Sequence, residues 1–433
     1  MSTFQTLPGF REFYPGDCAV RNFIFDHFRR TAKSFAFEEY DAPIIEPMEL
    51  FTAKSGDEIV SQLFNFEDRG GRQISMRPEL TPSLVKMIGN RANAMKKPIK
   101  WFNIGEQFRY ERPQKGRLRS FYQFNADIIG DDSPGADAEI VALAIQTLRN
   151  FALTRSDFRV RLSDRKLWAA FFESHGLDGT DTQAALVAID KSEREGEAKT
   201  LEAVEKICPS NAGKIFEGIQ RLKNVHSPRD LEKFCATCEN LADAASGCAE
   251  FFALLKRMDE FGLSDFVTID FGVVRGLAYY TGFVFEIFEN SGQSRALAGG
   301  GRYDNLFGKL GYSGLPAVGF AIGDVTLGNL LGEKNLIPPL PREVRCFIVY
   351  TEQTEKIAMA KVIALRERNV DVDYCLSPTS FGKQLKAASQ VGAKFAIIFG
   401  DEEVKANGVK IKNMLSGEEK PVEISKLAEV ISQ

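Results

Sequence analysis

The sequence QFRYERPQKGRLRSFYQ occupies residues 107–123 and predicts two strands joined by a basic loop. From Arg109 to Arg119 it holds five basic residues and one acid, Glu111, and a proline and a glycine favour a turn. A solvated hairpin tip is the alternative interpretation. Four of the five basic residues are arginines, whose planar guanidinium suits phosphate, and Phe121 offers a ring for stacking on a base.

Two later stretches carry residues of the kind that line a pocket. In VVRGLAYYTGFVFEIF, residues 273–288, Arg275 precedes the paired tyrosines Tyr279 and Tyr280. A lone arginine is usually a surface or ion-pair residue, but beside two hydroxyl groups it also fits a pocket wall. The stretch LAGGGRYDNL matches neither a Walker loop nor GxGxxG. Its glycines let the backbone lie close to a ligand or mark a bulge, and they are Gly299, Gly300 and Gly301.

The remaining polar candidates are Glu79 and Thr81 in MRPELTPSL, residues 76–84. They place a carboxylate and a hydroxyl group after an expected strand, although Glu79 also fits the start of a helix. The three histidines of the chain lie far apart, and none has the spacing of metal ligands. Cys235 and Cys238 form a CxxC, but the surrounding stretch has helical periodicity and no fourth ligand at zinc spacing. We therefore expect no metal site built by side chains.

Composition limits the class of protein. The chain has 433 residues, 44% hydrophobic and 26% charged, which is typical of a soluble protein of two or three domains. There is no apolar run of membrane length and no signal-peptide pattern. Seven cysteines are too few for a disulfide framework, so we expect a cytoplasmic protein with no membrane partner. The net charge of −4 means that any nucleic acid must bind to local basic patches.

Periodicity predicts a mixed α/β chain in four segments. A helix capped by Asp17 is expected from about Ala19 to Phe35, followed by strands such as 100–104 and 121–129. Helical periodicity prevails from about Leu177 to Asp265. The proline-rich stretch IPPLPRE precedes alternating strands and helices, which are typical of a small parallel α/β domain. The expected segments are 1–160, 161–265, 266–333 and 342–433.

Five stretches in this order resemble the histidine–tRNA ligase family of class II aminoacyl-tRNA synthetases. APIIEPMELF, FRYERPQKGRLRSFYQF and AVGFAIGDVTL are similar to the three class-defining motifs, and RGLAYYTG and AGGGRYD are similar to histidine-specific stretches. The resemblance covers nearly the whole chain. It implies that 1–160 and 266–333 form a catalytic core with an antiparallel sheet, that 161–265 is a helical insertion, and that 342–433 binds the anticodon.

The resemblance implies that histidine and ATP form histidyl-adenylate, and that the acyl group then passes to tRNA(His). ATP is then a substrate, accompanied by Mg²⁺, and the protein is a homodimer. For ATP the resemblance implies that Arg109 and Arg275 contact the α-phosphate as catalytic residues, that Glu111 receives the adenine amino group, and that Phe121 stacks on the ring.

For the amino acid the resemblance implies a polar pocket that pairs every donor and acceptor of histidine. The implied residues are Glu79, Thr81 and Gln123 at the ammonium group, Asp127 and Tyr280 at the imidazole nitrogens, Tyr279 beside them, and Gly299, Gly300 and Gly301 as the floor.

The chain departs from the family pattern at four positions. Asp127 stands where glutamate is usual, Ala278 where aspartate is usual, Leu80 where glycine is usual, and Thr326 where an arginine usually meets ATP. The alternative interpretation is a catalytically inactive relative, the regulatory subunit of ATP phosphoribosyltransferase. The basic loop, Arg275 and the C-terminal segment favour the ligase.

Overall fold

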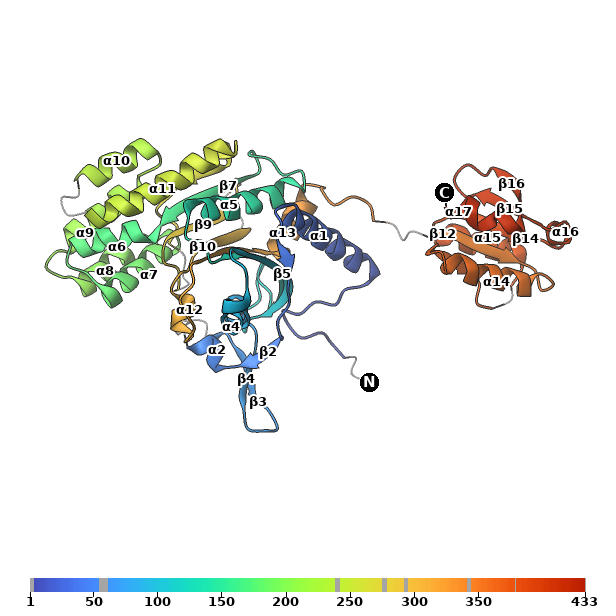
Figure 1. Ribbon diagram of the computed structural model, residues 1–433, viewed down its shortest axis with the longest axis horizontal. Coiled ribbons are helices and arrows are strands. Elements are labelled where there is room, and N and C mark those ends of the chain that lie inside the picture. Colours follow the sequence, from blue (N-terminus) through green and yellow to red (C-terminus); the bar gives the residue numbers. More distant parts are fainter. Residues whose placement is uncertain are drawn as a thin grey trace. The chain divides into compact units, whose positions relative to one another are not determined.

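The computed structural model describes residues 4–53, 61–237, 242–274, 279–291, 295–340, 344–377 and 379–432. The chain divides into two compact units, Met1–Pro338 and Pro339–Gln433, so the boundary lies within the proline-rich stretch of the sequence (Figure 1). Both units combine helices with sheets, which confirms the mixed α/β fold predicted from periodicity.

An eight-stranded sheet forms the centre of the first unit. Its inner strands pair antiparallel, whereas the strand at each edge pairs parallel to its neighbour. The expected antiparallel core sheet is thus confirmed. In spatial order the strands are β1 (Glu38–Glu39), β5 (Ile99–Phe108), β6 (Ser120–Ile129), β11 (Ala317–Gly323), β10 (Ala298–Arg302), β9 (Phe283–Glu289), β7 (Phe158–Asp164) and β8 (Val267–Ile269).

The hairpin of β5 and β6 carries the basic loop at its tip. The two strands pair without interruption from Ile99 opposite Ile129 to Phe108 opposite Ser120. The sequence predicted the first strand only over 100–104, because its second half mixes glycine and polar residues. Pairing with β6 keeps that half extended, so the loop begins only after Phe108.

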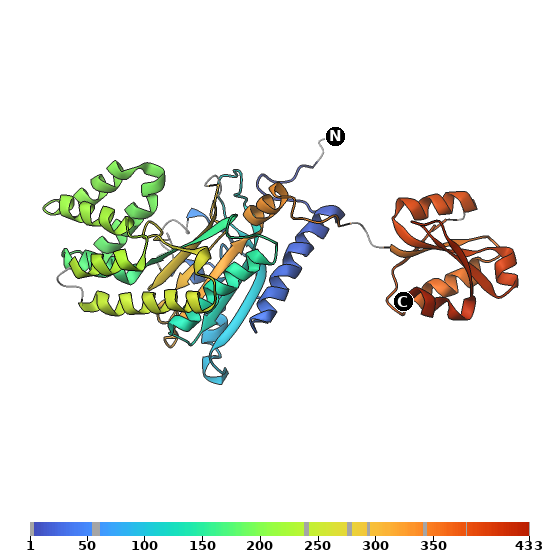
Figure 2. The ribbon, with the colours of Figure 1, turned by 90° about the horizontal axis from the view of Figure 1, so that it is seen from above.

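Three helices cover one face of this sheet. They are α1 (Pro15–Ser34), α5 (Pro134–Arg149) and α13 (Asp324–Glu333) (Figures 1 and 2). Alternate strand residues such as Phe102, Phe124 and Phe320 enter the buried core with them. The predicted start of α1 is wrong by one turn, because the helix begins at Pro15 and Asp17 accepts the Tyr14 N–H at 3.1 Å inside the first turn.

The other face of the sheet holds a second buried cluster and is only partly covered. Helices α4 (Thr81–Gly89) and α12 (Leu306–Lys309) contribute to this cluster, together with several tyrosines. A three-stranded antiparallel sheet precedes α4 in sequence and has the order β2 (Ile45–Pro47), β4 (Gln73–Met76) and β3 (Phe64–Glu67). The short helix α2 (Glu49–Thr52) follows β2 in the chain, and the 3₁₀ helix η1 (Ala92–Ala94) follows α4.

The predicted helical stretch between β7 and β8 is confirmed. It contains α6 (Arg165–Ser174), α7 (Gly179–Glu195), α8 (Glu197–Ile207), α9 (Ala212–Lys223), α10 (Pro228–Thr237), α11 (Ala242–Glu260) and η2 (Ser264–Phe266). Helix α11 packs against α5 and α6, which attaches this helical stretch to the helices behind the sheet.

The second unit is the small α/β domain that the alternating pattern predicts, but its sheet is mixed rather than wholly parallel, because two further strands add antiparallel after the predicted ones. Its sheet runs β13 (Val372–Tyr374), β12 (Val344–Tyr350), β14 (Ala393–Phe399), β15 (Gly408–Asn413) and β16 (Glu419–Glu423), with the first three parallel and the last two antiparallel. Buried clusters lie on both faces of this sheet. The helices are α14 (Glu355–Arg366), α15 (Phe381–Gln390), α16 (Asp401–Lys405), η3 (Ile424–Lys426) and α17 (Leu427–Ser432).

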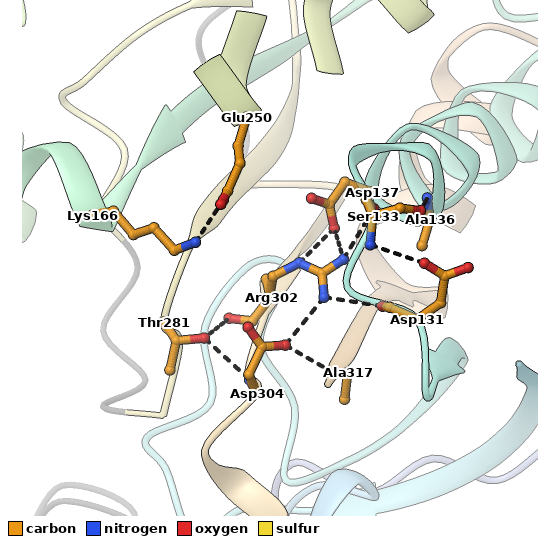
Figure 3. Close-up of polar contacts among 10 residues, drawn as sticks. All are labelled: Asp131, Ser133, Ala136, Asp137, Lys166, Glu250, Thr281, Arg302, Asp304 and Ala317. Carbon is orange, nitrogen blue, oxygen red and sulfur yellow. Dashed lines mark hydrogen bonds and ion pairs between the residues drawn. The ribbon is translucent and has the colours of Figure 1, made fainter. Parts of the chain in front are cut away.

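A buried ion pair fixes the end of β10 to the helices behind the sheet (Figure 3). Arg302 Nε donates to Asp137 Oδ1 of α5 at 2.9 Å, and the two side chains are 3% and 10% exposed. The same guanidinium donates to Asp304 Oδ1 at 3.1 Å and to the Asp131 carbonyl at 3.2 Å. These bonds satisfy a charge that is expensive to bury alone, and they position the chain just after β10.

Asp137→Ala should destabilise the first unit by about 3–5 kcal/mol, because Arg302 stays buried without its main partner. Urea unfolding followed by fluorescence measures this loss. The control is Glu250→Ala, which removes the exposed ion pair to Lys166 seen in the same view and should cost less than about 1 kcal/mol. Equal losses in the two variants would contradict the importance given to the buried pair.

Candidate active site

A polar pocket opens on the face of the large sheet that the three helices leave uncovered. It brings together residues from six separate stretches of the chain. Its lining residues are Glu79, Thr81, Arg109, Gln123, Asn125, Asp127, Tyr279, Tyr280, Gly299, Tyr303, Gly319, Phe320 and Ala321.

The strand register explains why polar side chains gather here. Gln123, Asn125 and Asp127 alternate along β6 and therefore point to the same face. Their partners on β11 are Gly323, Ala321 and Gly319, which carry almost no side chain. A row of polar groups therefore lies beside a low, open floor.

Asp127 occupies space that exists only because residue 319 is glycine. A Cβ atom built on Gly319 would lie 1.9 Å from Asp127 Oδ1, so even alanine would displace the carboxylate. Tyr303 donates its hydroxyl to the same oxygen at 2.5 Å. Burial raises the pKa of Asp127 to about 7, although the bond from Tyr303 acts in the opposite direction.

Glu79 and Tyr279 form a second buried pair in the pocket. The Tyr279 hydroxyl donates to Glu79 Oε2 at 2.9 Å, and the two residues are only 5% exposed. Burial and the neighbouring Glu79 carboxylate raise the pKa of Tyr279 well above its usual value, so this hydroxyl stays protonated. Thr81 begins α4, which places Glu79 at the start of a helix as well as in the pocket.

Arg109 stands where β5 ends and the basic loop begins. Its Nε donates to the Pro78 carbonyl at 3.0 Å, and its guanidinium lies 5.4 Å from the centre of the Phe121 ring. These contacts hold the side chain at the pocket, while Phe121 itself supports it from outside the lining. Within the loop, Arg117 Nε pairs with Glu111 Oε2 at 2.7 Å, and the Glu111 side chain is 9% exposed.

The predicted residues separate into three groups. Eight of them line the pocket: Glu79, Thr81, Arg109, Gln123, Asp127, Tyr279, Tyr280 and Gly299. Glu111, Phe121, Gly300 and Gly301 lie outside its lining. Arg275 lies outside the described residues, as does Ala278.

Gly300 has a packing role that explains its identity. A Cβ atom at this position would lie 2.3 Å from the Gly319 carbonyl oxygen and 2.6 Å from Phe320 Cβ. The glycine therefore allows β10 and β11 to approach behind the pocket floor. Of the consecutive glycines, Gly299 is the one that faces the pocket.

Sequence reasoning missed five lining residues: Asn125, Tyr303, Gly319, Phe320 and Ala321. Asn125 could have been found, because it shares the period-two pattern of Gln123 and Asp127. The β11 residues line the pocket because β11 pairs with β6, which lies almost 200 residues earlier in the chain. No local sequence pattern predicts that pairing.

Thr326 lies beside the basic loop. Its Oγ1 donates weakly to the Gly323 carbonyl at 3.4 Å. A Cβ atom built on Gly116 of the loop would lie 3.5 Å from Thr326 Cγ2 and 3.8 Å from Arg295 Cδ. The loop, Thr326 and Arg295 therefore meet at one place near Gly116.

Within the described ranges, no group of three or more histidine, cysteine or acidic side chains is arranged to hold a metal ion. The carboxylates nearest the pocket are engaged with protein groups: Asp127 with Tyr303 and Glu79 with Tyr279. Among the described helices, none has the length and apolar character needed to cross a lipid bilayer.

An antiparallel sheet with helices on one face, and a polar pocket beside a basic hairpin loop on the other, defines a class II aminoacyl-tRNA synthetase core. Residues 9–326 match the family described as Histidyl-tRNA synthetase, and residues 344–433 match the Anticodon binding domain. The chain therefore belongs to the histidyl-tRNA synthetase family, which confirms the resemblance found in the sequence.

Individual relatives agree with this assignment over nearly full length. The chain is 47% identical to a histidine–tRNA ligase of Opitutus terrae, covering 98% of this chain and 96% of that protein. It is 36% identical to a chloroplastic/mitochondrial histidine–tRNA ligase of Arabidopsis thaliana, covering 97% and 85%. A histidyl-tRNA synthetase structure from Nostoc sp. PCC 7120 superposes with a TM-score of 0.79 at 26% identity, covering 100% and 99% of the two chains.

The pKa of Asp127 gives a pH prediction. Its value of about 7 lies above the ordinary 3.8, so the folded state holds the proton more tightly than the unfolded state. The resulting stability is present below about pH 4 and is lost as the pH rises through about 7. Asp127→Asn keeps an acceptor for Tyr303 but has no carboxyl proton to lose. The melting temperature of the variant minus that of the parent protein should therefore rise by roughly 3 °C or more from about pH 5 to about pH 8.

Thermal unfolding of both proteins across this range measures the difference. A melting-temperature difference that stays constant with pH would show that Asp127 does not titrate in this window.

Proposed function

We propose that this chain attaches histidine to tRNA(His) in an ATP-dependent reaction, and that the pocket on the sheet face activates the amino acid. One observation carries the proposal: buried carboxylate and hydroxyl groups converge on an open floor in a chain that shares 47% identity with a histidine–tRNA ligase. Relatives at 36–47% identity over almost the whole chain bear that name, which supports the ligase rather than the inactive regulatory subunit.

The reaction consists of two group transfers. A carboxylate oxygen of histidine bonds to the α-phosphorus of ATP, and the bond to the bridging oxygen breaks, releasing pyrophosphate. A ribose hydroxyl of the terminal adenosine then bonds to the acyl carbon, and AMP leaves. The first step brings two anions together, so positioning and cationic stabilisation dominate its catalysis.

The histidine end of the pocket selects its substrate by pairing polar groups. In this proposal Asp127 and Tyr280 hold the imidazole nitrogens, with Tyr279 beside them, while Glu79, Thr81 and Gln123 hold the ammonium group. The carboxylate of Asp127 is buried, so a substrate without an N–H at this point leaves it with Tyr303 as its single donor. Asp127 is one methylene shorter than the glutamate usual in the family, and its carboxylate lies against the backbone of Gly319.

The ATP end uses the basic loop. Arg109 and Arg275 contact the α-phosphate as catalytic residues, Phe121 stacks on adenine, and Glu111 receives the adenine amino group. Glu111 is paired with Arg117, but a carboxylate has about four acceptor positions and can serve both partners. Mg²⁺ accompanies ATP on its phosphates, as the ion usually does with nucleotide substrates.

The proposal extends to the organisation of the chain. Residues 1–160 and 266–333 form the catalytic core, and 161–265 the helical insertion, except that 161–164 complete strand β7 of the core sheet. Residues 342–433 form the anticodon-binding domain, supported by the match of 344–433 to that family. The chain acts as a homodimer in the cytoplasm. Ile44 and Ile45, in the stretch similar to the first motif, are 44% and 47% exposed and suit such an interface.

We further propose that Arg295 replaces the cation missing at Thr326. Both side chains approach Gly116 of the basic loop, so the Arg295 guanidinium is within reach of a nucleotide held by that loop. An arginine at position 295 can contact a phosphate of ATP in place of one at position 326, because its side chain is long and its planar guanidinium pairs with phosphate oxygens.

Arg295→Ala should raise the KM for ATP about tenfold while leaving the KM for histidine unchanged, because a phosphate contact is lost. Histidine-dependent ATP–pyrophosphate exchange with varied ATP measures this effect. Arg257→Ala removes a similar exposed arginine from α11 and serves as the control. An unchanged KM for ATP in Arg295→Ala would exclude the proposed role.

The same exchange reaction tests the function as a whole. Purified protein, histidine, ATP and labelled pyrophosphate should yield labelled ATP only when histidine is present, and charged tRNA(His) should form when tRNA is added. Histidine binding without exchange would contradict the ligase. Stimulation of an ATP phosphoribosyltransferase by such a protein would identify the regulatory subunit instead.

A further inference from the structure

Tyr40 belongs to the second buried cluster, on the pocket side of the large sheet. The proposed mechanism gives it no role. Tyr40 follows β1, and its N–H donates to the Phe102 carbonyl at 2.9 Å. Its ring stacks on Trp101 with centroids 5.4 Å apart, and Trp101 lies directly opposite Asp127 in the pairing of β5 with β6. Tyr40 shares this cluster with the pocket tyrosines, including Tyr303.

The hydroxyl of Tyr40 has no hydrogen-bond partner among the residues that the structure describes, although the residue is only 9% exposed. Burial raises its pKa well above the usual value, and the nearby carboxylates of Asp127 and Asp41 act in the same direction, against Arg77. The hydroxyl is therefore a buried donor, and the stacking of its ring on Trp101, the strand partner of Asp127, places it on the pocket side of the sheet. Leaving such a group unpaired costs about 1–3 kcal/mol, so phenylalanine would be the more stable choice for packing alone.

The other charged neighbours of Tyr40 are already occupied. Arg77 donates to Asp41 Oδ1 at 3.2 Å, to the Ala42 carbonyl at 2.7 Å and to the Glu106 carbonyl at 2.9 Å. Asp41 also accepts from Asn103 at 3.1 Å. Asp41 also reaches water, since its side chain is 76% exposed, whereas buried Asp127 has the single donor Tyr303 and gains most from a second one.

We propose that Tyr40 is a positioning residue for amino-acid binding: its hydroxyl donates to Asp127 when a bound imidazole N–H requires that carboxylate to be ionised. The inference rests on the proposed function. In the free protein Asp127 accepts one hydroxyl, from Tyr303, and a buried anion with a single donor is poorly stabilised. A second tyrosine hydroxyl supplies the missing donor at the moment the charge forms. In this way the hydroxyl of Tyr40, which does not line the pocket, raises the affinity for histidine.

Tyr40→Phe tests this role because it removes only the hydroxyl. The variant should be at least as stable as the parent protein, since the unpaired donor is gone, yet its KM for histidine should rise about tenfold. Its kcat and its KM for ATP in pyrophosphate exchange should stay unchanged, because Tyr40 touches neither nucleotide nor reacting atoms. A merely structural tyrosine would not separate these quantities.

Tyr350→Phe is the matched control. Tyr350 is also buried, but its hydroxyl donates to the Cys375 carbonyl at 2.9 Å in the second unit. This variant should lose stability and keep its KM for histidine, the opposite of Tyr40→Phe. An unchanged KM for histidine in Tyr40→Phe, with normal exchange by the parent protein, would overturn the role of Tyr40 while leaving the proposed function intact. Absence of exchange in the parent protein would instead overturn the function.

Discussion

The site depends on one close approach: the Asp127 carboxylate lies over the bare backbone of Gly319, on the adjacent strand. Any side chain at residue 319 would occupy the place of the carboxylate oxygen. With that place open, Tyr303 binds the carboxylate from one side and leaves its other side toward the pocket. Burial favours the neutral acid, so a ligand with a polar N–H binds by offsetting the cost of ionising this carboxyl group inside the protein.

The strand register determines which side chains of β5 and β6 face the helices and which face the pocket. Even-numbered residues such as Phe102 and Phe124 pack against helices, while odd-numbered residues such as Gln123 and Asp127 face the pocket. A shift of one residue in the pairing would exchange the two sets of side chains. Because the hydrophobic core keeps the apolar set buried, it also fixes which side chains face the pocket. The Arg302–Asp137 pair adds a fixed point where β10 leaves the sheet, one residue before Tyr303.

Local sequence patterns predicted much of this molecule. The mixed fold, the helical stretch, the C-terminal α/β domain and eight pocket residues followed from periodicity, turn chemistry and the resemblance of ordered motifs. Gly319 and Tyr303 were missed because their importance comes from strands that meet far along the chain. Tyr40 was missed for a related reason, since its neighbour Trp101 faces Asp127 only after β5 and β6 pair. Glu111 was predicted, but its ion pair with Arg117 depends on the folded shape of the loop.

The account is tested most directly by a crystal structure with a non-hydrolysable analogue of histidyl-adenylate. It predicts an imidazole nitrogen within hydrogen-bond distance of Asp127, with the ring above Gly319 and the phosphate analogue turned toward Arg109. An imidazole bound elsewhere, with Asp127 still contacting protein groups alone, would contradict it.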